Sequence, residues 1–222
     1  LSLTLAGFDV LDVHMTDLIE GREDLSGVSF VGFPGGFANS DVLGSAVGWG
    51  WSFKKNRRAY EAVQKFYARP DTLSIGICNG CQLMMQLGVI DPKVRMDHNE
   101  SGKFESIFTS VDIVESPSVL LNGLEGSRLG IWVAHGEGRF RLDGSSHKIA
   151  IKYSSPDYPI NPNGSDGAAA AITSLDGRHL AIMPHLERSL YSWNWAYYPK
   201  RVDELSPWIE VFRNGYRWLK AK

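Results

Sequence analysis

The stretch Leu73–Gly88 decides the fold, and it reads LSIGICNGCQLMMQLG. It opens with a short apolar run, as in a buried parallel strand, and continues with good helix formers that end at a glycine. Cys78 lies at the sharp turn between the two, where open α/β sheets place their ligands and a helix N-terminus favours a thiolate. Gly76 and Gly80 leave room for a strained turn. The pattern predicts a nucleophile elbow built on sulfur, although a lone cysteine after an apolar run is more often a core residue.

Length and composition limit the classes of protein. The chain has 222 residues, of which 43% are hydrophobic and 22% charged, enough for one sizeable core or two small domains. A net charge of −2 without like-charge runs gives no sign of a nucleic-acid or membrane surface. No apolar run reaches the ~18–20 residues of a membrane span, and no signal peptide is visible. Two cysteines three residues apart form no disulfide framework, so we expect a reducing, cytoplasmic location.

Strand and helix patterns alternate along the chain. Leu1–Leu5 reads as the end of a helix that stops at Gly7, so we expect an upstream strand and part of that helix to be missing. Further helices are predicted at Lys54–Ala68 and Pro207–Leu219. Besides the strand before Cys78, strands are predicted at Phe8–His14, Val28–Phe33, Phe108–Val114, Gly130–Ala134, Lys148–Tyr153 and, as a hairpin, Ala168–Thr173 and His179–Met183. This alternation predicts an α/β layer fold with a mixed sheet.

A glycine pair follows the second predicted strand, within Pro34–Phe37. Two glycines past a strand end let backbone N–H groups point into a cleft, although an ordinary turn has the same pattern. The pair is no phosphate loop, because no Gly-Lys-Ser/Thr follows, and no ATP site is legible elsewhere in the chain.

A nucleophilic cysteine needs a base, and the base needs an orienting group. His185 and Glu187 directly follow the last predicted strand, and residues two apart in an extended segment point the same way. Glu187 is then placed to fix the imidazole tautomer. His135 is the rival base, because it also follows a strand and precedes Glu137 by two residues. A surface histidine after a hairpin is the plainer alternative for His185.

Two motifs at this point resemble those of class I, triad-type glutamine amidotransferases: Gly76–Gln82 resembles their nucleophile motif and Pro184–Arg188 their His-x-Glu motif. More narrowly, the chain resembles the glutaminase domain of the long, single-polypeptide phosphoribosylformylglycinamidine synthases, where this domain lies at the C-terminus. The segments that carry this narrower resemblance are Pro34–Phe37 with Asp41–Gly44, the cysteine motif, Val133–Phe140, and Ser206–Trp208 with Phe212–Asn214. They span nearly the whole chain in the expected order.

The resemblance implies a three-layer fold over residues 1–222, with a mixed, mostly parallel central sheet. It also implies roles for five residues. Cys78 would be the nucleophile, His185 the base and Glu187 the orienting acid. Gly36 and Asn79 would supply the N–H groups of an oxyanion hole.

The resemblance implies roles for two further residues, and the sequence differs from the family's motifs at two places. Gln82 and His135 would line the glutamine site. Leu186 stands where the family usually has proline, which relaxes the backbone but leaves the neighbouring side chains available. Ala38–Ser40 continues the Gly-Gly-Phe segment, where the family more often has Ser-Tyr-Gly, so we expect the local contacts to differ there.

The reaction that the resemblance implies is glutamine hydrolysis through a cysteine thioester. The ammonia would pass to a synthetase domain of the same polypeptide, which uses ATP to convert formylglycinamide ribonucleotide to the amidine in purine biosynthesis. No cofactor is expected in this domain, and ATP and Mg²⁺ belong to the synthetase domain. The expected partners are glutamine and that domain, with no nucleic acid, metal or membrane.

Other readings stay open at this point. The Cys-x-x-Cys formed with Cys81 also fits a thiol oxidoreductase, and the same fold fits a cysteine hydrolase for another substrate or a module without activity. A zinc site is the least favoured, because no second ligand pair has metal spacing. Six aromatic residues in polar loops favour a docking surface or the edge of the core: Trp49, Trp51, Trp193, Trp195, Tyr197 and Tyr198.

Overall fold

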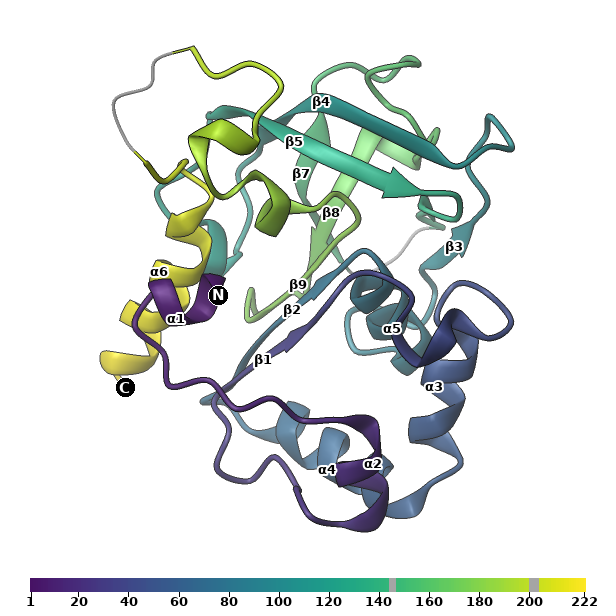
Figure 1. Cartoon of the computed structure of the whole chain (residues 1–222), viewed down its shortest axis with the longest axis vertical. Helices are drawn as coiled ribbons and strands as arrows, with labels where there is room; N and C mark the ends of the chain where they lie inside the picture. Colours follow the sequence, from purple (N-terminus) through teal and green to yellow (C-terminus); the bar gives the residue numbers. More distant parts are fainter. Residues whose placement is uncertain (144–146, 200–203) are drawn as a thin grey trace.

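A seven-stranded sheet forms the centre of the molecule in the computed structural model, which describes residues 1–143, 147–199 and 204–222 (Figure 1). In spatial order its strands are β1 (Phe30–Phe33), β2 (Leu73–Ile77), β9 (His179–Ile182), β8 (Ala169–Thr173), β7 (Lys148–Tyr153), β4 (Glu105–Ile113) and β5 (Arg128–His135). A second sheet pairs β3 (Arg95–Asp97) with β6 (Arg139–Arg141). The α/β class and the mixed sheet are confirmed.

The prediction of a mostly parallel sheet is wrong. β1 and β9 run parallel to β2, but the four remaining pairings, β9 with β8, β8 with β7, β7 with β4 and β4 with β5, are antiparallel. Parallel neighbours need a crossover long enough to hold a helix, as between β1 and β2. Strands β8 and β9 are joined by a tight turn, so this pair folds back on itself. The connection between β4 and β5, residues 114–127, holds only one 3₁₀ turn (Val119–Leu121) and no α-helix, and this pair is antiparallel as well.

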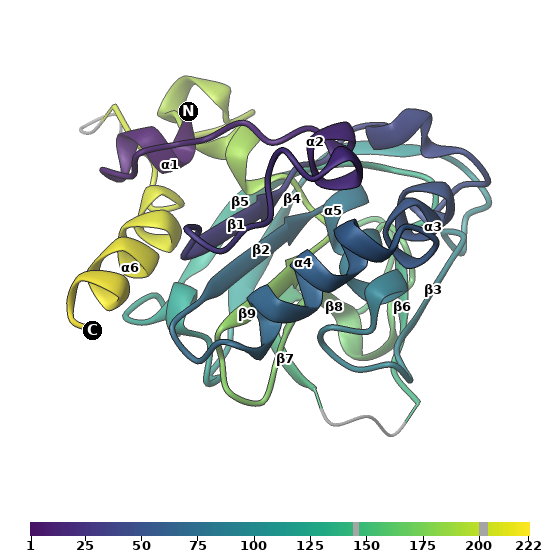
Figure 2. The same ribbon diagram turned by 90° about the horizontal axis from the view of Figure 1, so that it is seen from below.

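Helices cover both faces of the parallel part of the sheet (Figure 2). On one side lie α3 (Val47–Lys54), α4 (Arg57–Ala68) and α5 (Asn79–Leu87), and α5 contacts β1, β2 and β9. On the other side α6 (Ile209–Lys220) lies beside α1 (Ser2–Leu5). A shorter helix, α2 (Met15–Glu20), packs on α4. None of the helices in these described ranges is long and apolar enough to cross a membrane.

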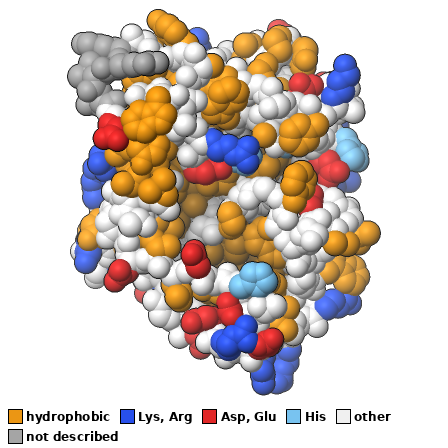
Figure 3. All heavy atoms as spheres, in the orientation of Figure 1, with side chains coloured by type: hydrophobic (Ala, Val, Ile, Leu, Met, Phe, Trp, Pro, Cys, Tyr) orange, Lys and Arg blue, Asp and Glu red, His pale blue; other side chains and the backbone are white. Residues whose placement is uncertain are grey.

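The predicted strand at Phe8–His14 does not form. Val10 and Leu11 are exposed there, and no backbone N–H from Asp9 to Val13 finds an acceptor among the described residues. A cavity of about 1390 Å³ separates this segment from β1, the edge strand of the sheet. Figure 3 shows the hollow on this face, with hydrophobic side chains along its walls. The apolar alternation was read correctly, but a strand also needs a neighbour at hydrogen-bonding distance.

Candidate active site

Cys78 lies at a strained turn between β2 and α5. Its φ of 52° and ψ of −107° are rare for a residue with a side chain, and such strain costs about 1–3 kcal/mol. Gly76 and Gly80, which flank the turn, are required because a side chain would not fit at either position. A Cβ at Gly76 would lie 2.5 Å from the carbonyl oxygen of Gly80, and a Cβ at Gly80 would lie 2.1 Å from that of Phe33. The elbow predicted from the spacing of these residues is therefore present.

His185 and Glu187 come together beside the elbow. His185 follows β9 and is held against β5, because its N–H donates to the carbonyl of Trp132 at 2.7 Å. Its Nδ1 lies 2.6 Å from Oε1 of Glu187. Gly35 brings the imidazole and the cysteine together, since a Cβ there would lie 2.6 Å from Cε1 of His185 and 3.1 Å from Cβ of Cys78.

The charge on His185 follows from these neighbours. Burial alone would lower its pKa, but hydrogen bonding and charge from Cys78 and Glu187 outweigh burial and raise the pKa to about 9. The imidazole ring therefore carries a second proton at neutral pH. Since Nδ1 faces the carboxylate, the Nε2 proton is the one available on the cysteine side.

Gly36 and Asn79 flank the same turn from the two parallel strands. Gly36 has a φ of +101° and open space where a Cβ would be. Among the described residues the backbone N–H of neither Gly36 nor Asn79 has a hydrogen-bond acceptor. The side chain of Asn79 is anchored, because its Nδ2 donates to Asp41 and Gln82 at 2.9 Å each. Two N–H groups without an acceptor thus remain at the two strand ends that flank the elbow.

Gln82 joins α5 to the loop after β5. Its Nε2 donates to the carbonyl of Glu137 at 2.7 Å, and its Oε1 accepts from Asn79. The Glu137 carboxylate accepts a hydrogen bond from Ser45. Ser45 belongs to a loop in which six residues other than glycine have positive φ, namely Asn39, Ser40, Asp41, Leu43, Ser45 and Ala46. A loop with a strained backbone therefore contacts the site through Asn79 and Glu137. Backbone strain of this kind is common at functional sites.

His135 lies in the same region but in a different environment from His185. Its side chain is buried, and its Nδ1 pairs with Oδ1 of Asn99 at 3.2 Å instead of with Glu137. Burial, and then the charge of His185, lower the pKa of His135 to about 3. His135 is therefore neutral, and of the two candidate bases it is His185 that has a carboxylate partner.

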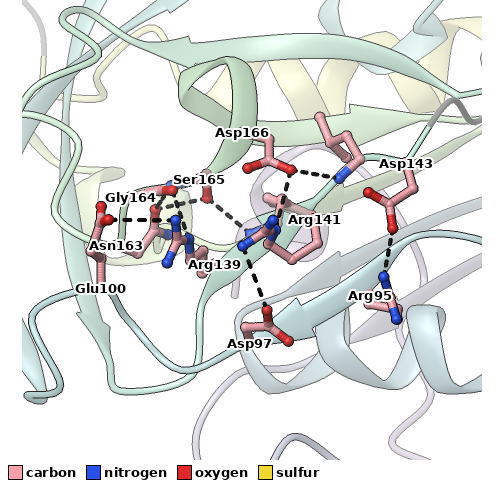
Figure 4. Close-up of polar contacts among 12 residues, drawn as sticks. Arg95, Asp97, Glu100, Arg139, Arg141, Asp143, Asn163, Gly164, Ser165 and Asp166 are labelled. Atoms are coloured by element: carbon pink, nitrogen blue, oxygen red, sulfur yellow. Dashed lines mark hydrogen bonds and ion pairs between the residues drawn. The ribbon is translucent and has the colours of Figure 1, made fainter.

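Salt bridges fasten the segment that follows His135 (Figure 4). Arg139 donates to the carbonyl of Gly164 at 2.9 Å and lies 3.5 Å from Glu100. Arg141, on β6, lies between Asp97 and Asp166, as Figure 4 shows. Exposed ion pairs add only about 0–1 kcal/mol each, so the main effect of this network is to fix the position of the loop.

Cys81 faces the core of the protein. It is fully buried, and burial, followed by the charge of Cys78, raises the pKa of its thiol well above the usual value. Both cysteines are free. Cys81 is thus a core residue of α5. Within the described ranges no group of three or more His, Cys, Asp or Glu residues is placed to hold a metal ion.

Sequence reasoning missed three contributors to the site. The carbonyl of Ala134 lies 3.8 Å from the Cys78 sulfur, Asp41 anchors Asn79, and Asn99 anchors His135. Asn99 and His135 are 36 residues apart, and no local pattern connects them. Asp41 lies in a segment noted for its resemblance, but nothing in the sequence indicated its contact.

An elbow cysteine, a histidine and a carboxylate on an α/β sheet define a triad-type cysteine hydrolase or transferase site. A family model described as the CobB/CobQ-like glutamine amidotransferase domain matches residues 1–219, and the chain belongs to this family.

Sequence relatives cover nearly all of the chain. A protein of Arabidopsis thaliana named "Probable phosphoribosylformylglycinamidine synthase, chloroplastic/mitochondrial" is 46% identical over 97% of this chain, which is 17% of the plant protein. The phosphoribosylformylglycinamidine synthase of Homo sapiens is 40% identical over 96% of this chain and 18% of the human protein. The chain thus spans less than a fifth of the length of these curated relatives.

Solved structures share the fold. The structure of PurLQS from Thermotoga maritima matches with a TM-score of 0.75 at 23% identity, over 99% of this chain and 89% of that chain. A crystal structure of a glutamine amidotransferase matches with a TM-score of 0.53 at 16% identity, over 83% and 81% of the two chains. At these identities the likeness concerns the fold alone.

Proposed function

We propose that this domain hydrolyses glutamine to glutamate and ammonia through a thioester on Cys78. The observation that carries the proposal is that the strained cysteine elbow and the imidazole of buried His185, paired with half-buried Glu187, lie on either side of Gly35. Cys78 is the nucleophile, His185 the proton carrier and Glu187 the orienting acid. Membership in the glutamine amidotransferase family supports glutamine as the substrate.

The chemistry follows from this arrangement. The Cys78 thiolate attacks the side-chain amide carbon, and the N–H groups of Gly36 and Asn79 stabilise the oxyanion, at about 2.7–4 kcal/mol for one such donor. Protonated His185 gives its Nε2 proton to the leaving ammonia. The neutral imidazole then takes a proton from water, which attacks the thioester and releases glutamate. Glu187 holds the ring in the required tautomer throughout.

We also propose that the domain serves a longer polypeptide with phosphoribosylformylglycinamidine synthase activity, to which it delivers ammonia. The names of the relatives and the small share of their length that this chain spans support this proposal. ATP and Mg²⁺ would act in the synthetase part, outside this domain. A cytoplasmic location stays a prediction, because the plant relative is named as chloroplastic or mitochondrial.

Exposed aromatic side chains offer a docking surface for that synthetase part. Trp51, Trp193 and Tyr197 are 53%, 56% and 73% exposed, as expected for rings that meet a partner. Trp49 is only 8% exposed and belongs to the core, so it is not part of the docking surface predicted from the aromatic residues. Docking of these loops would order the site and gate ammonia release.

The cavity beside β1 supports the prediction that a further strand completes this domain. Phe30 and Val31 lie on an apolar edge strand that has no pairing strand on its outer side among the described residues, an arrangement that natural proteins usually avoid. A strand from elsewhere in the longer polypeptide would pair with β1 and fill the space next to Phe8–His14.

The test of the proposed function is glutamate release from glutamine by the chain, alone and together with the rest of the synthase and its ligands. Slow release that rises on addition of the partner supports both hydrolysis and gating. Equal rates would contradict gating alone. No release under either condition, from correctly folded protein, would contradict the assignment of the domain as a glutaminase.

A further inference from the structure

The two N–H groups assigned above to the oxyanion come from different segments of the chain. Gly36 follows β1, and Asn79 begins α5 just after β2. The sheet joins the two segments as far as the pairing of Phe33 with Gly76. Gly36 lies beyond that pair and has no side chain with which to contact the helix. A contact outside the sheet is therefore needed to fix the two N–H groups relative to each other.

Asp41 supplies such a contact. Its Oδ1 accepts from Nδ2 of Asn79 and from the backbone N–H of Ala46, each at 2.9 Å. Asp41 lies five residues after Gly36, in the loop that continues from it. One carboxylate oxygen thus connects the segment that carries the first N–H group to the residue that carries the second.

The side-chain amide of Asn79 is held in one orientation. Both hydrogens of Nδ2 are used, because Nδ2 also donates to Oε1 of Gln82 at 2.9 Å. Gln82 cannot be reversed either, since its Nε2 donates to the carbonyl of Glu137, which can only accept. Oδ1 of Asn79 is buried without a partner among the described residues. Two hydrogen bonds therefore hold this side chain, and Asp41 provides one of them.

Hydrogen bonds, more than packing, hold the loop around Asp41. The next two residues, Val42 and Leu43, are 52% and 80% exposed, and Asp41 itself has an unfavourable φ of +44°. The far end of the loop is attached separately, because the carbonyl of Ser45 accepts from Nε2 of Gln86 at 3.2 Å. A change at Asp41 should therefore weaken the contact with the start of α5 while the loop stays attached to the helix.

We propose, on the basis of the glutaminase function above, that Asp41 is a positioning residue that holds the N–H of Asn79 in register with the N–H of Gly36. The amide oxygen of bound glutamine carries little charge, whereas the oxygen of the tetrahedral intermediate carries a full negative charge. A misplaced donor therefore costs more in the transition state than in the bound substrate. Asp41 acts on kcat and leaves the affinity for glutamine nearly unchanged.

The first experiment measures glutamate release by the chain together with the rest of the synthase. Asp41→Ala should lower kcat by about 10–10²-fold, less than the loss of a whole donor, and change KM by less than about threefold. Asp41→Asn keeps an oxygen acceptor of the same shape and should stay within about threefold of the native kcat. A raised KM with unchanged kcat, or an Asp41→Asn variant as slow as Asp41→Ala, would overturn the proposal.

Asp176→Ala is the matched control for these variants. Asp176 also accepts from a backbone N–H of its own loop, that of Arg178, but it lies before β9, at the opposite end of that strand from His185. Its replacement should leave kcat and KM unchanged. Binding of glutamine to the Cys78→Ala chain should likewise be the same with and without Asp41→Ala. A loss of binding would show that Asp41 maintains the pocket as a whole, and would overturn the positioning role.

The second experiment reads the position of the donor directly, by ¹⁵N NMR relaxation of the labelled chain, and needs no activity. The backbone N–H of Asn79 should become more mobile in Asp41→Ala and stay as rigid as in the native chain in Asp41→Asn and Asp176→Ala. Equal rigidity of Asn79 in all four proteins would overturn the proposal. If the native protein releases no glutamate under any condition, the proposed function is contradicted, and the relaxation result still decides whether Asp41 positions Asn79.

Discussion

Two segments of this molecule share one sequence pattern and have opposite electrostatics. His135 and His185 each follow a strand, and each precedes a glutamate by two residues. His185 pairs with its glutamate and has a pKa raised to about 9, whereas His135 pairs with Asn99 and has a pKa lowered to about 3. The difference teaches that the surroundings of the ring, more than the local sequence, decide the charge of a buried histidine: Cys78 and Glu187 raise the pKa of His185, whereas burial and the charge of His185 lower the pKa of His135.

The largest effect on glutamine hydrolysis is expected from removing the thiol of Cys78, which lies close to both histidine segments. Cys78→Ala should reduce glutamine hydrolysis by at least about 10⁴-fold, because no other group can form the thioester. Synthesis from added ammonium salts in the longer protein should survive. Both rates are measured by glutamate release and by product formation. If a folded variant lost ammonia-dependent synthesis too, the glutaminase would not be a separable domain.

Substituting each histidine in turn tests directly whether His135 and His185 have different roles. His185→Asn should lower kcat by about 10²–10⁴-fold, since proton transfer is lost. His135→Asn should raise KM for glutamine by about tenfold with a small change in kcat, since it removes a contact to the substrate. Steady-state kinetics of the two variants separates the roles. Near-normal turnover in His185→Asn with loss in His135→Asn would reverse the assignment.

A change at Glu187 tests the origin of the raised pKa. The imidazolium of His185 is present below pH 9 and lost above it, so kcat/KM for glutamine should fall as the pH rises through about 9. Glu187→Gln removes one cause of the raised pKa, so the decline should begin at lower pH, with turnover reduced at neutral pH. A pH–rate profile of both proteins checks this. An alkaline limb at the same pH in both would show that Glu187 does not set the charge of His185.

The smallest effect on turnover is expected at the second cysteine. Cys81→Ser should keep turnover within about threefold, because Cys81 is buried away from the reacting atoms. It should lower the free energy of unfolding by about 1–3 kcal/mol, because a hydroxyl replaces an apolar thiol in the core. Glutamate release and thermal unfolding measure the two effects. Complete loss of activity in a folded variant would favour the thiol oxidoreductase reading.

The parts of the fold and site that the sequence predicted are local. The elbow at Cys78 follows from a strand, two glycines and a helix within 16 residues, and His185 and Glu187 are two residues apart. Their geometry needs little information from the rest of the chain. The hairpin at Ala168–Thr173 and His179–Met183 was readable for the same reason, and it forms β8 and β9.

The parts that could not be predicted depend on contacts between distant residues. The direction of β4, β5 and β7 is set by which strands meet, and their sequences alternate whether the neighbour is parallel or antiparallel. Phe8–His14 has the pattern of a strand, but a cavity separates it from β1, and it pairs with no strand in the part of the chain that the structure describes. Asn99 lies in an Asn-x-Ser triplet that carries no structural signal, yet its side chain pairs with Nδ1 of a histidine 36 residues away.

The most direct test of the central claim is covalent labelling of the native chain with a glutamine analogue that carries a diazoketone in place of the carboxamide. The analogue needs a bound glutamine skeleton, a reactive sulfur and a proton donor at the same place. We predict one label per chain, located on Cys78 by peptide mass spectrometry, slowed by excess glutamine and lost in His185→Asn. A folded chain that takes no label, or takes it at Cys81, would contradict the claim that Cys78 and His185 form a glutamine-hydrolysing site.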